Sequence, residues 1–302
     1  MSKSLRLVLA LSVSMLALPL FDSALAAASS SPPRCVVSLS PTATETLFAI
    51  GAGPQVQAVD TDSDYPTAGL PAKRVNALNP SVEAVLGICK RTPSYPTTKP
   101  DLVIISYDAN EIQQKLTNLG VKVVDQDAPT TLAGAYDQIE QLGQLTGHVA
   151  TAYALVASLK KAIDADVASV PPHLNKKITV YYELSTSPYY SLTSDTFVGS
   201  LMKSLGLVNI ADGDATSADA GYPELSAEYI ASANPKLIFL AGDASVTSVG
   251  KRTAFKDISA VLRHHVVELN ADVASRWGPR LGLLMDQLTR AVKAVLANQK
   301  LG

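Results

Sequence analysis

Apolar and polar positions follow two patterns along this chain, one typical of strands and the other of helices. Short runs rich in Val, Ile and Leu that end at turn residues predict strands, whereas apolar residues spaced three or four apart predict helices. The predicted strands are 35–39, 55–60, 101–106, 121–125, 178–182, 236–240 and 266–269, and the predicted helices are 42–50, 81–86, 110–118, 131–145, 196–205, 226–233 and 281–298. Since strands and helices follow one another in turn, we expect an α/β fold with mostly parallel sheets covered on both faces. At the first helix, Thr42 and Glu45 have the spacing of a capping box.

The longest helical pattern covers residues 146–170. Thr146 is expected to cap its start and Pro171 to end it. An ordinary long surface helix would show the same pattern. We interpret it as a helix connecting two lobes, because the sequences on either side resemble each other in the order of their elements. Its apolar stripe, with a period near 3.6 residues, consists of Val149, Ala152, Leu155, Val156, Leu159, Ile163, Val167 and Val170.

Three short motifs recur in the same order on both sides of this helix. The matching segments are 40–41 with 187–188, 65–66 with 222–223, and 81–83 with 226–228. The first half also carries a proline-broken insertion around 87–96, which is expected to bulge from its lobe. The predicted organisation is an N-terminal lobe (27–145), a connecting helix (146–170) and a C-terminal lobe (171–302). Each lobe is expected to be Rossmann-like, with a ligand cleft between the two.

Residues 1–26 have the features of a signal peptide. Lys3 and Arg6 precede a short apolar run, and Ala24-Leu25-Ala26 forms a small-residue cleavage site. A retained signal anchor is the alternative, but the apolar run is short for a membrane span. No cysteine follows the small residues, so a lipoprotein anchor is not expected. The sequence predicts an exported, periplasmic protein cleaved near Ala26.

Charge and motif content argue against several functional classes. The net charge is −2 with acidic and basic residues interspersed, so no basic face for nucleic acid is expected. The sequence lacks a nucleophile-elbow, dinucleotide-binding or P-loop motif, so we do not predict an enzyme. The four histidines fall outside the loops expected at the cleft, which argues against a bound metal ion. An extracytoplasmic sensor or interaction module remains the alternative to a transport component.

Cys35 and Cys89 are the two cysteines of the chain. Cys35 opens the first predicted strand, and Cys89 lies in the insertion before the strand at 101–106. Two parallel neighbouring strands begin at the same end of a sheet, so the two sulfurs can meet there, and an oxidising compartment would allow them to pair. Two unpaired thiols are the alternative. We predict a structural disulfide.

Aromatic residues gather on the loops that follow predicted strands. Ligands of open α/β sheets bind outside the carboxyl ends of the strands. Rings with one polar tip suit a large, flat, partly polar ligand, although each could instead pack against its own lobe. The candidate ligand-binding residues are Tyr65, Tyr189, Tyr190, Tyr222, Trp277 and, as a charged group, Arg276; Tyr107 is a weaker candidate.

These motifs together resemble the ABC-importer binding proteins for vitamin B12 and ferric siderophores. The resemblance covers nearly all of the mature chain and implies two α/β lobes joined by one long helix, with the ligand held between them. It implies an ABC permease and its ATPase as partners of a monomeric binding protein without a cofactor of its own. The motifs are VSLSPTATE at 37–45, SDYP at 63–66, NPSVE at 79–83, Tyr182-Glu183 with Pro188-Tyr189, YPELSAE at 222–228 and GPRL at 278–281.

The resemblance also implies roles for individual residues. Tyr65 and Tyr222 match aromatic residues that line the cleft in B12 binders, and Glu83 and Glu228 match glutamates that dock onto permease arginines. Stabilisation of helix N-termini is an alternative role for the two glutamates. Siderophore binders often place arginines in the cleft, and Arg276 and Arg280 are the candidates here. The ligand class stays open between a corrinoid, a ferric siderophore or heme-like iron chelate, and another large complex.

Overall fold

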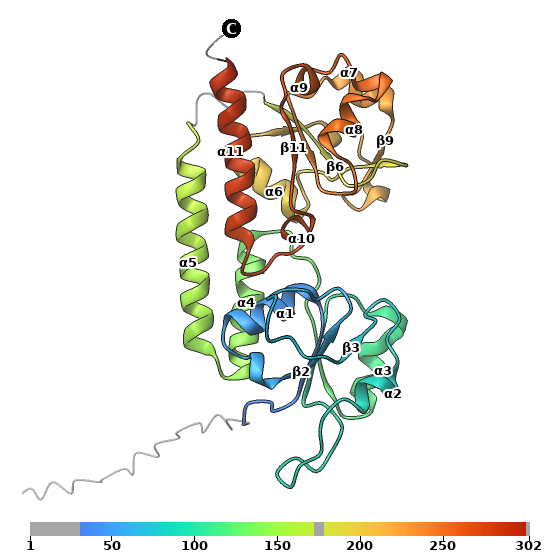
Figure 1. The fold of residues 1–302 in the computed structure, drawn as a ribbon, viewed down its shortest axis with the longest axis vertical. Coiled ribbons are helices and arrows are strands. Elements are labelled where there is room, and N and C mark those ends of the chain that lie inside the picture. Colours follow the sequence, from blue (N-terminus) through green and yellow to red (C-terminus); the bar gives the residue numbers. More distant parts are fainter. Residues whose placement is uncertain (1–30, 172–177, 300–302) are drawn as a thin grey trace, which may run out of the picture. The chain divides into compact units, whose positions relative to one another are not determined.

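The computed structural model describes residues 31–171 and 178–299 (Figure 1). The predicted signal peptide, residues 1–26, lies outside this part of the chain. Of the helices in the described part, none is both long and apolar enough to cross a membrane.

The first lobe is built around a five-stranded parallel sheet with the order β3-β2-β1-β4-β5. Helices α1 and α4 cover one face, where Leu47 and Ile139 pack on Ile104. Helices α2 and α3 cover the other, where Val85 and Leu116 join the apolar cluster. The strands are β1 (Val36–Leu39), β2 (Val56–Asp60), β3 (Arg74–Val75), β4 (Leu102–Ile105) and β5 (Lys122–Asp125), and the helices are α1 (Pro41–Ala49), α2 (Val82–Leu86), α3 (Ile112–Asn118) and α4 (Leu132–Thr146).

The second lobe has a four-stranded parallel sheet with the order β11-β10-β6-β8, and a small antiparallel pair, β7 with β9. Tyr182 and Phe239 face the same apolar core as α6 and α11, whereas Tyr181 and Phe255 belong to the opposite core. The strands are β6 (Thr179–Glu183), β7 (Tyr189–Tyr190), β8 (Val208–Asn209), β9 (Glu224–Leu225), β10 (Leu237–Leu240) and β11 (Val266–Glu268), and the helices are α6 (Phe197–Ser204), α7 (Ala227–Ala233), α8 (Val246–Gly250), α9 (Ser259–Leu262) and α10 (Ala271–Ala274).

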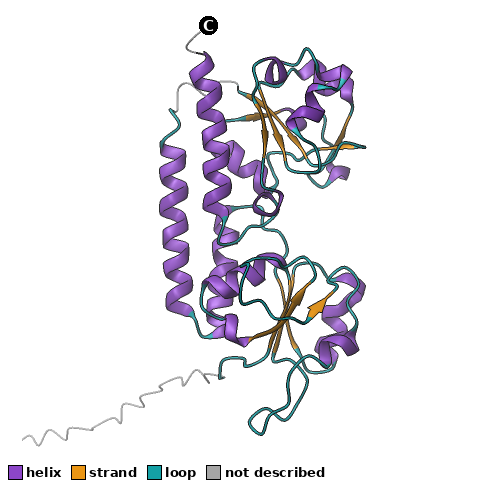
Figure 2. Ribbon diagram, viewed as in Figure 1, coloured by secondary structure: helices purple, strands orange, loops and turns teal. Residues whose placement is uncertain are grey.

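One long helix connects the lobes, and a second long helix lies beside it. Helix α5 (Val149–Ala168) packs against α4 of the first lobe and lies beside α11 (Leu281–Gln299), which contacts β10 of the second (Figure 2). The expected fold class, two α/β lobes with mostly parallel sheets and a long connecting helix, is therefore confirmed.

The start of the connecting helix differs from the prediction. Thr146 is the last residue of α4, and its hydroxyl donates to the carbonyl of Leu142. Gly147 then adopts a left-handed conformation with φ 80°, which suits glycine and separates α4 from α5. The two helices lie very close at this turn: a Cβ atom at position 143 would lie 2.4 Å from the Cβ of Ala152, so only glycine fits there. The sequence placed the boundary between the two helices at residues 145 and 146, and the structure moves it to Gly147, so that the predicted capping residue Thr146 belongs to α4.

The expected capping box at Thr42 and Glu45 is also wrong. Helix α1 is capped by Ser40, whose hydroxyl oxygen accepts a hydrogen bond from the backbone N–H of Ala43. Glu45 instead forms ion pairs with arginines distant in sequence. The third predicted helix starts at Ile112, because Asn110 and Glu111 both have φ 57°.

Cys35 and Cys89 form a disulfide bond at the amino end of β1, with their Cα atoms 6.0 Å apart. Tyr95 of the insertion packs on it, and the three residues form a small buried cluster. The hydroxyl of Tyr95 donates to the carbonyl of Lys99 at 2.6 Å, and the guanidinium of Arg34 lies 5.0 Å from the ring centre. The insertion therefore has its own small core, away from the carboxyl ends of the strands.

Candidate functional site

A cavity of about 230 Å³ lies at the carboxyl ends of the second lobe's strands. The first lobe contributes Ala128, from the segment between β5 and α4. Most of the lining is apolar or aromatic, and two of its aromatic residues, Tyr222 and Trp277, are predicted ligand-binding residues. The lining residues are Ala128, Tyr182, Leu184, Leu192, Thr196, Phe197, Val198, Tyr222, Ala241, Ala271, Ala274, Ser275, Arg276 and Trp277.

A second cavity of about 750 Å³ adjoins the first and shares with it Ala128, Thr196, Phe197 and Tyr222. Its lining is more polar. Hydroxyl groups predominate, and the charged residues are two aspartates and one lysine. The remaining lining residues are Pro129, Thr130, Thr193, Ser194, Asp195, Lys203, Asp212, Ala215, Thr216, Ala220 and Gly221. The two cavities together form a region with an aromatic part and a polar part, which we call the binding region.

Tyr222 stands at the junction of the two cavities. Gly221 precedes it with φ 88°, and its carbonyl accepts a hydrogen bond from the backbone N–H of Thr193 at 2.8 Å. A Cβ atom at position 221 would lie only 2.8 Å from the methyl group of Thr196, so this position requires glycine. Tyr222 is 46% exposed although it lines both cavities, which leaves much of its ring available to a ligand.

Trp277 is the single tryptophan of the chain and lies in the loop between α10 and α11. Its indole Nε1–H donates a hydrogen bond of 2.7 Å to Oε1 of Gln138 on α4. A tryptophan from the C-terminal half of the chain is thus hydrogen-bonded to a helix of the first lobe.

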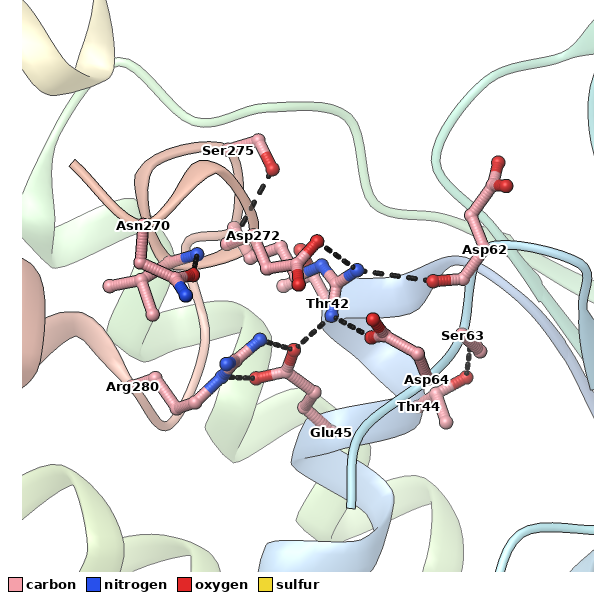
Figure 3. Close-up of polar contacts among 12 residues, drawn as sticks. Thr42, Thr44, Glu45, Asp62, Ser63, Asp64, Asn270, Asp272, Ser275 and Arg280 are labelled. Atoms are coloured by element: carbon pink, nitrogen blue, oxygen red, sulfur yellow. Dashed lines mark hydrogen bonds and ion pairs between the residues drawn. The ribbon is translucent and has the colours of Figure 1, made fainter. Parts of the chain in front are cut away.

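The same loop is joined to the first lobe by an ion-pair cluster (Figure 3). Arg280 faces the carboxylate of Glu45 with two nitrogens, at 2.8 and 2.5 Å. Arg276 contacts Glu45 at 2.7 Å, Asp64 at 2.8 Å and Asp272 at 2.9 Å. The side chain of Glu45 is 1% exposed, and that of Arg276 7%. Three carboxylates therefore surround two buried guanidinium groups.

The pKa values in this cluster follow from burial and charge. Burial opposes the charged form of Arg276, but its hydrogen bonds to Glu45 and Asp64 outweigh this, so its pKa is raised. Burial likewise tends to raise the pKa of Asp64, but the hydrogen bond and charge of Arg276 lower it below its ordinary value. Although Arg276 lines the aromatic cavity, its charge is already compensated by carboxylates of the protein.

The remaining predicted ligand-binding tyrosines lie elsewhere among the described residues. Tyr65 is 41% exposed, and the guanidinium of Arg280 lies 4.4 Å from its ring centre. Tyr189 packs on Phe255 with ring centres 5.5 Å apart, whereas Tyr190, in the same short strand, is exposed. These three do not belong to the lining of the two cavities described above. Their contact with ligand stays a prediction.

Sequence reasoning missed Phe197, Tyr182 and Gln138. Phe197 is the first residue of α6 and directly follows the capping Thr196. Because loops after strands and the helix starts that follow them line ligand sites in α/β folds, this position was a signal for Phe197. Tyr182 belongs to the strand predicted at 178–182 and is 1% exposed, so it resembles an ordinary core residue. Gln138 lies within a regular helical pattern, and nothing in that pattern indicates a partner in another part of the chain.

Glu83 and Glu228 occupy equivalent positions in the two lobes. Each is the second residue of a short helix whose capping serine, Ser81 or Ser226, accepts a backbone hydrogen bond. Both glutamates are exposed, and neither forms an ion pair with any residue that the structure describes. A backbone hydrogen bond and the hydroxyl of Ser81 lower the pKa of Glu83, so it is charged at neutral pH.

Within residues 31–171 and 178–299, no three His, Cys, Asp or Glu side chains are grouped so that they could hold a metal ion. The groups that the binding region offers to a ligand are aromatic rings, hydroxyl groups and charged side chains, of which Arg276 is already paired with carboxylates.

Comparison with known proteins places this chain in a family. A sequence model described as periplasmic binding protein matches residues 36–273. The chain belongs to the periplasmic binding protein family. Proteins of this family are of a substrate-binding type.

Three similar proteins illustrate the range of this periplasmic binding protein family. An uncharacterized ABC transporter substrate-binding lipoprotein of Bacillus subtilis is 29% identical over 86% of this chain and 80% of its own. The vitamin B12-binding protein of Vibrio cholerae is 29% identical over 87% of this chain and 90% of its own. A possible iron-binding, periplasmic solute-binding protein from Staphylococcus epidermidis has a crystal structure that matches with a TM-score of 0.73. It is 28% identical and covers 87% of this chain and 99% of its own.

Proposed function

We propose that this protein binds a corrinoid outside the cytoplasm and delivers it, as a monomer, to an ABC permease and its ATPase. The observation that supports this most directly is the binding region, in which an aromatic cavity opens into a larger one lined by hydroxyl groups. A corrinoid has a broad ring system that suits aromatic walls and many uncharged amide groups that suit hydroxyl partners. The vitamin B12-binding protein of Vibrio cholerae is similar to this chain over most of both chains.

The charges of the binding region support a neutral ligand over an anionic iron chelate. Two aspartates, Asp195 and Asp212, and Lys203 line the polar cavity. Arg276 lines the aromatic one, but three carboxylates already pair with it. An anionic ferric chelate would have to compete with these carboxylates for the guanidinium and would lie near the two aspartates. A neutral ligand meets neither cost.

Direct titration tests the ligand class. We expect the mature chain to bind cyanocobalamin in calorimetry, and Tyr222→Ala to weaken the affinity by about 30-fold, because buried aromatic anchors contribute 2 kcal/mol or more. Tyr153→Ala is the matched control, since Tyr153 is an exposed tyrosine on α5. Binding of a ferric siderophore or hemin, with no binding of any corrinoid by the folded protein, would contradict the proposal.

Glu83 and Glu228 are proposed to dock onto cationic groups of the permease, one on each lobe. Both carboxylates are exposed and form no ion pair within the described part of the chain. This supports docking, because charge complementarity between partners speeds encounter and orients the complex. Replacing both with alanine should leave corrinoid affinity within about twofold of wild type and lower transport into vesicles containing the permease by at least about tenfold.

Asp164→Ala is the control for this transport measurement, because it removes an exposed carboxylate from α5. The same assay with the Asp164 variant should match wild type. If the double glutamate variant also transports at the wild-type rate, the docking role is wrong.

A further inference from the structure

Trp277 lines the aromatic cavity from a loop that has little secondary structure of its own. An indole ring is an effective ligand-binding surface only if its orientation is fixed before the ligand arrives, because ordering a mobile side chain costs affinity. Indole Nε1–H is a donor only, so a partly buried tryptophan needs an acceptor to hold it. The acceptor here is Oε1 of Gln138, at 2.7 Å.

The amide of Gln138 has one orientation that satisfies both of its ends. Its Nε2 donates to the backbone carbonyl of Asp127 at 2.8 Å. With the nitrogen directed to that carbonyl, the amide oxygen is directed to the indole of Trp277. A reversed amide would place oxygen against oxygen at Asp127 and N–H against N–H at Trp277. The hydrogen bond to Asp127 therefore fixes the amide orientation in which the oxygen of Gln138 can accept from Trp277.

The helix that carries Gln138 is itself attached to the end of β5. Gln126 is 4% exposed, and its backbone N–H donates a hydrogen bond of 2.9 Å to the carbonyl of Ile105. Its side-chain Nε2 donates to the carbonyl of Gln138 at 3.1 Å and to Oε1 of Gln141 at 2.8 Å. Gln138 is thus supported from the first lobe's sheet, while the group that it holds lines a cavity of the second lobe.

We infer that Gln138 is a positioning residue, which holds Trp277 in place as a wall of the ligand cavity. The inference rests on the proposed function for the identity of the ligand, but the anchoring itself does not depend on it. Together with the pairing of Arg276 and Arg280, this hydrogen bond attaches the loop to the first lobe. Trp277, hydrogen-bonded to α4 of the first lobe, and Tyr222 of the second lobe both line the aromatic cavity, so a ring system bound there can contact groups attached to both lobes.

The single indole N–H of the chain provides a test that needs no ligand. In a ¹⁵N–¹H spectrum of the full mature protein, Trp277 gives one indole signal, and its exchange with water should be slowed by the hydrogen bond. In Gln138→Met the signal should shift, and its exchange should become about tenfold faster, which corresponds to the loss of one hydrogen bond. Gln138→Glu keeps an acceptor for the indole but loses the donor to the carbonyl of Asp127, so its indole signal should exchange more slowly than in Gln138→Met and faster than in wild type.

Gln141→Met is the matched control, because Gln141 lies one turn further along α4 and contacts Gln126 instead of Trp277. It should leave the indole signal unchanged. An unchanged signal and exchange rate in Gln138→Met would overturn the inference, as would equal changes in the Gln138 and Gln141 variants.

Ligand binding provides the second arm. Corrinoid affinity should fall by about three- to tenfold in Gln138→Met and by less in Gln138→Glu, which keeps the acceptor for the indole. If the indole signal changes as expected but the affinity does not, Trp277 is held by Gln138 without serving the ligand, and the positioning role is wrong. If the wild-type protein binds no corrinoid, the proposed function fails, and the indole measurement still decides whether Gln138 anchors Trp277.

Discussion

Replacing Glu45 with alanine should lower the free energy of unfolding by about 3–5 kcal/mol, the usual cost of removing one partner from a buried ion pair. Glu45 is 1% exposed at its side chain and pairs with both Arg276 and Arg280. Its removal takes a negative charge away from two guanidinium groups that are only 7% and 13% exposed, so water cannot replace it. Chemical denaturation followed by circular dichroism measures the change.

An exposed ion pair on α11 provides the control for this measurement. Arg290 and Asp286 form an ion pair with side chains 69% and 44% exposed. Because water already solvates both groups, Arg290→Ala should cost less than about 1 kcal/mol. A Glu45 variant as stable as the Arg290 variant would show that the cluster adds nothing to the attachment of the loop.

The same cluster makes the attachment sensitive to acid. The folded pKa of Asp64 is depressed below its ordinary value of 3.8, chiefly because the hydrogen bond and charge of Arg276 outweigh the effect of burial. A carboxyl group with a depressed pKa stabilises the fold above that ordinary value. Its contribution is lost as the pH falls through the folded pKa. The loop is therefore held most firmly at neutral pH.

Removing the disulfide should have an effect of similar size. The bond between Cys35 and Cys89 spans 54 positions of sequence. A loop of this length restricts the unfolded chain enough to stabilise the fold by about 4 kcal/mol in the chain-entropy description, with measured losses of about 2–5 kcal/mol. We expect the double variant Cys35→Ser, Cys89→Ser to lose that amount in chemical denaturation.

Reduction of the wild-type protein gives an independent check, because it breaks the bond without changing the sequence further. The reduced protein and the double variant should have similar stability. Corrinoid affinity should change little in either, because the bond lies at the amino end of β1 and the binding region lies at the carboxyl ends of the strands. A reduced wild-type protein as stable as the oxidised one would contradict the predicted contribution.

The described contacts also explain why charge in the binding region differs from what the sequence suggests. Arg276 and Arg280 are close to a predicted ligand cleft and, from their positions alone, could serve an anionic ligand. In the structure their guanidinium groups contact Glu45, Asp64 and Asp272. Their role in attaching the loop is therefore visible, whereas a role of Arg276 in ligand contact remains a proposal.

The order of elements was predictable because it depends on local patterns. Alternating strand and helix signals specify an α/β fold, and two copies of the same motifs indicate two lobes. The shortest elements, such as β3 and β7, escaped prediction because two residues do not form a periodic pattern. The division between α4 and α5 was predicted at residues 145 and 146, whereas the structure places it at Gly147, because a glycine in the left-handed conformation, and not the apolar spacing, ends α4.

The sequence alone determined the alternation of strands and helices, the likeness of the two halves and the loops on which rings gather. Only the tertiary structure decided which of those rings share a cavity and which partners the buried charges have. The physical reason is distance along the chain: Trp277 lies 139 positions from Gln138, and Arg280 lies 235 positions from Glu45. Hydrogen bonds and ion pairs act over a few ångströms, so contacts of this kind exist only after folding has brought distant segments together.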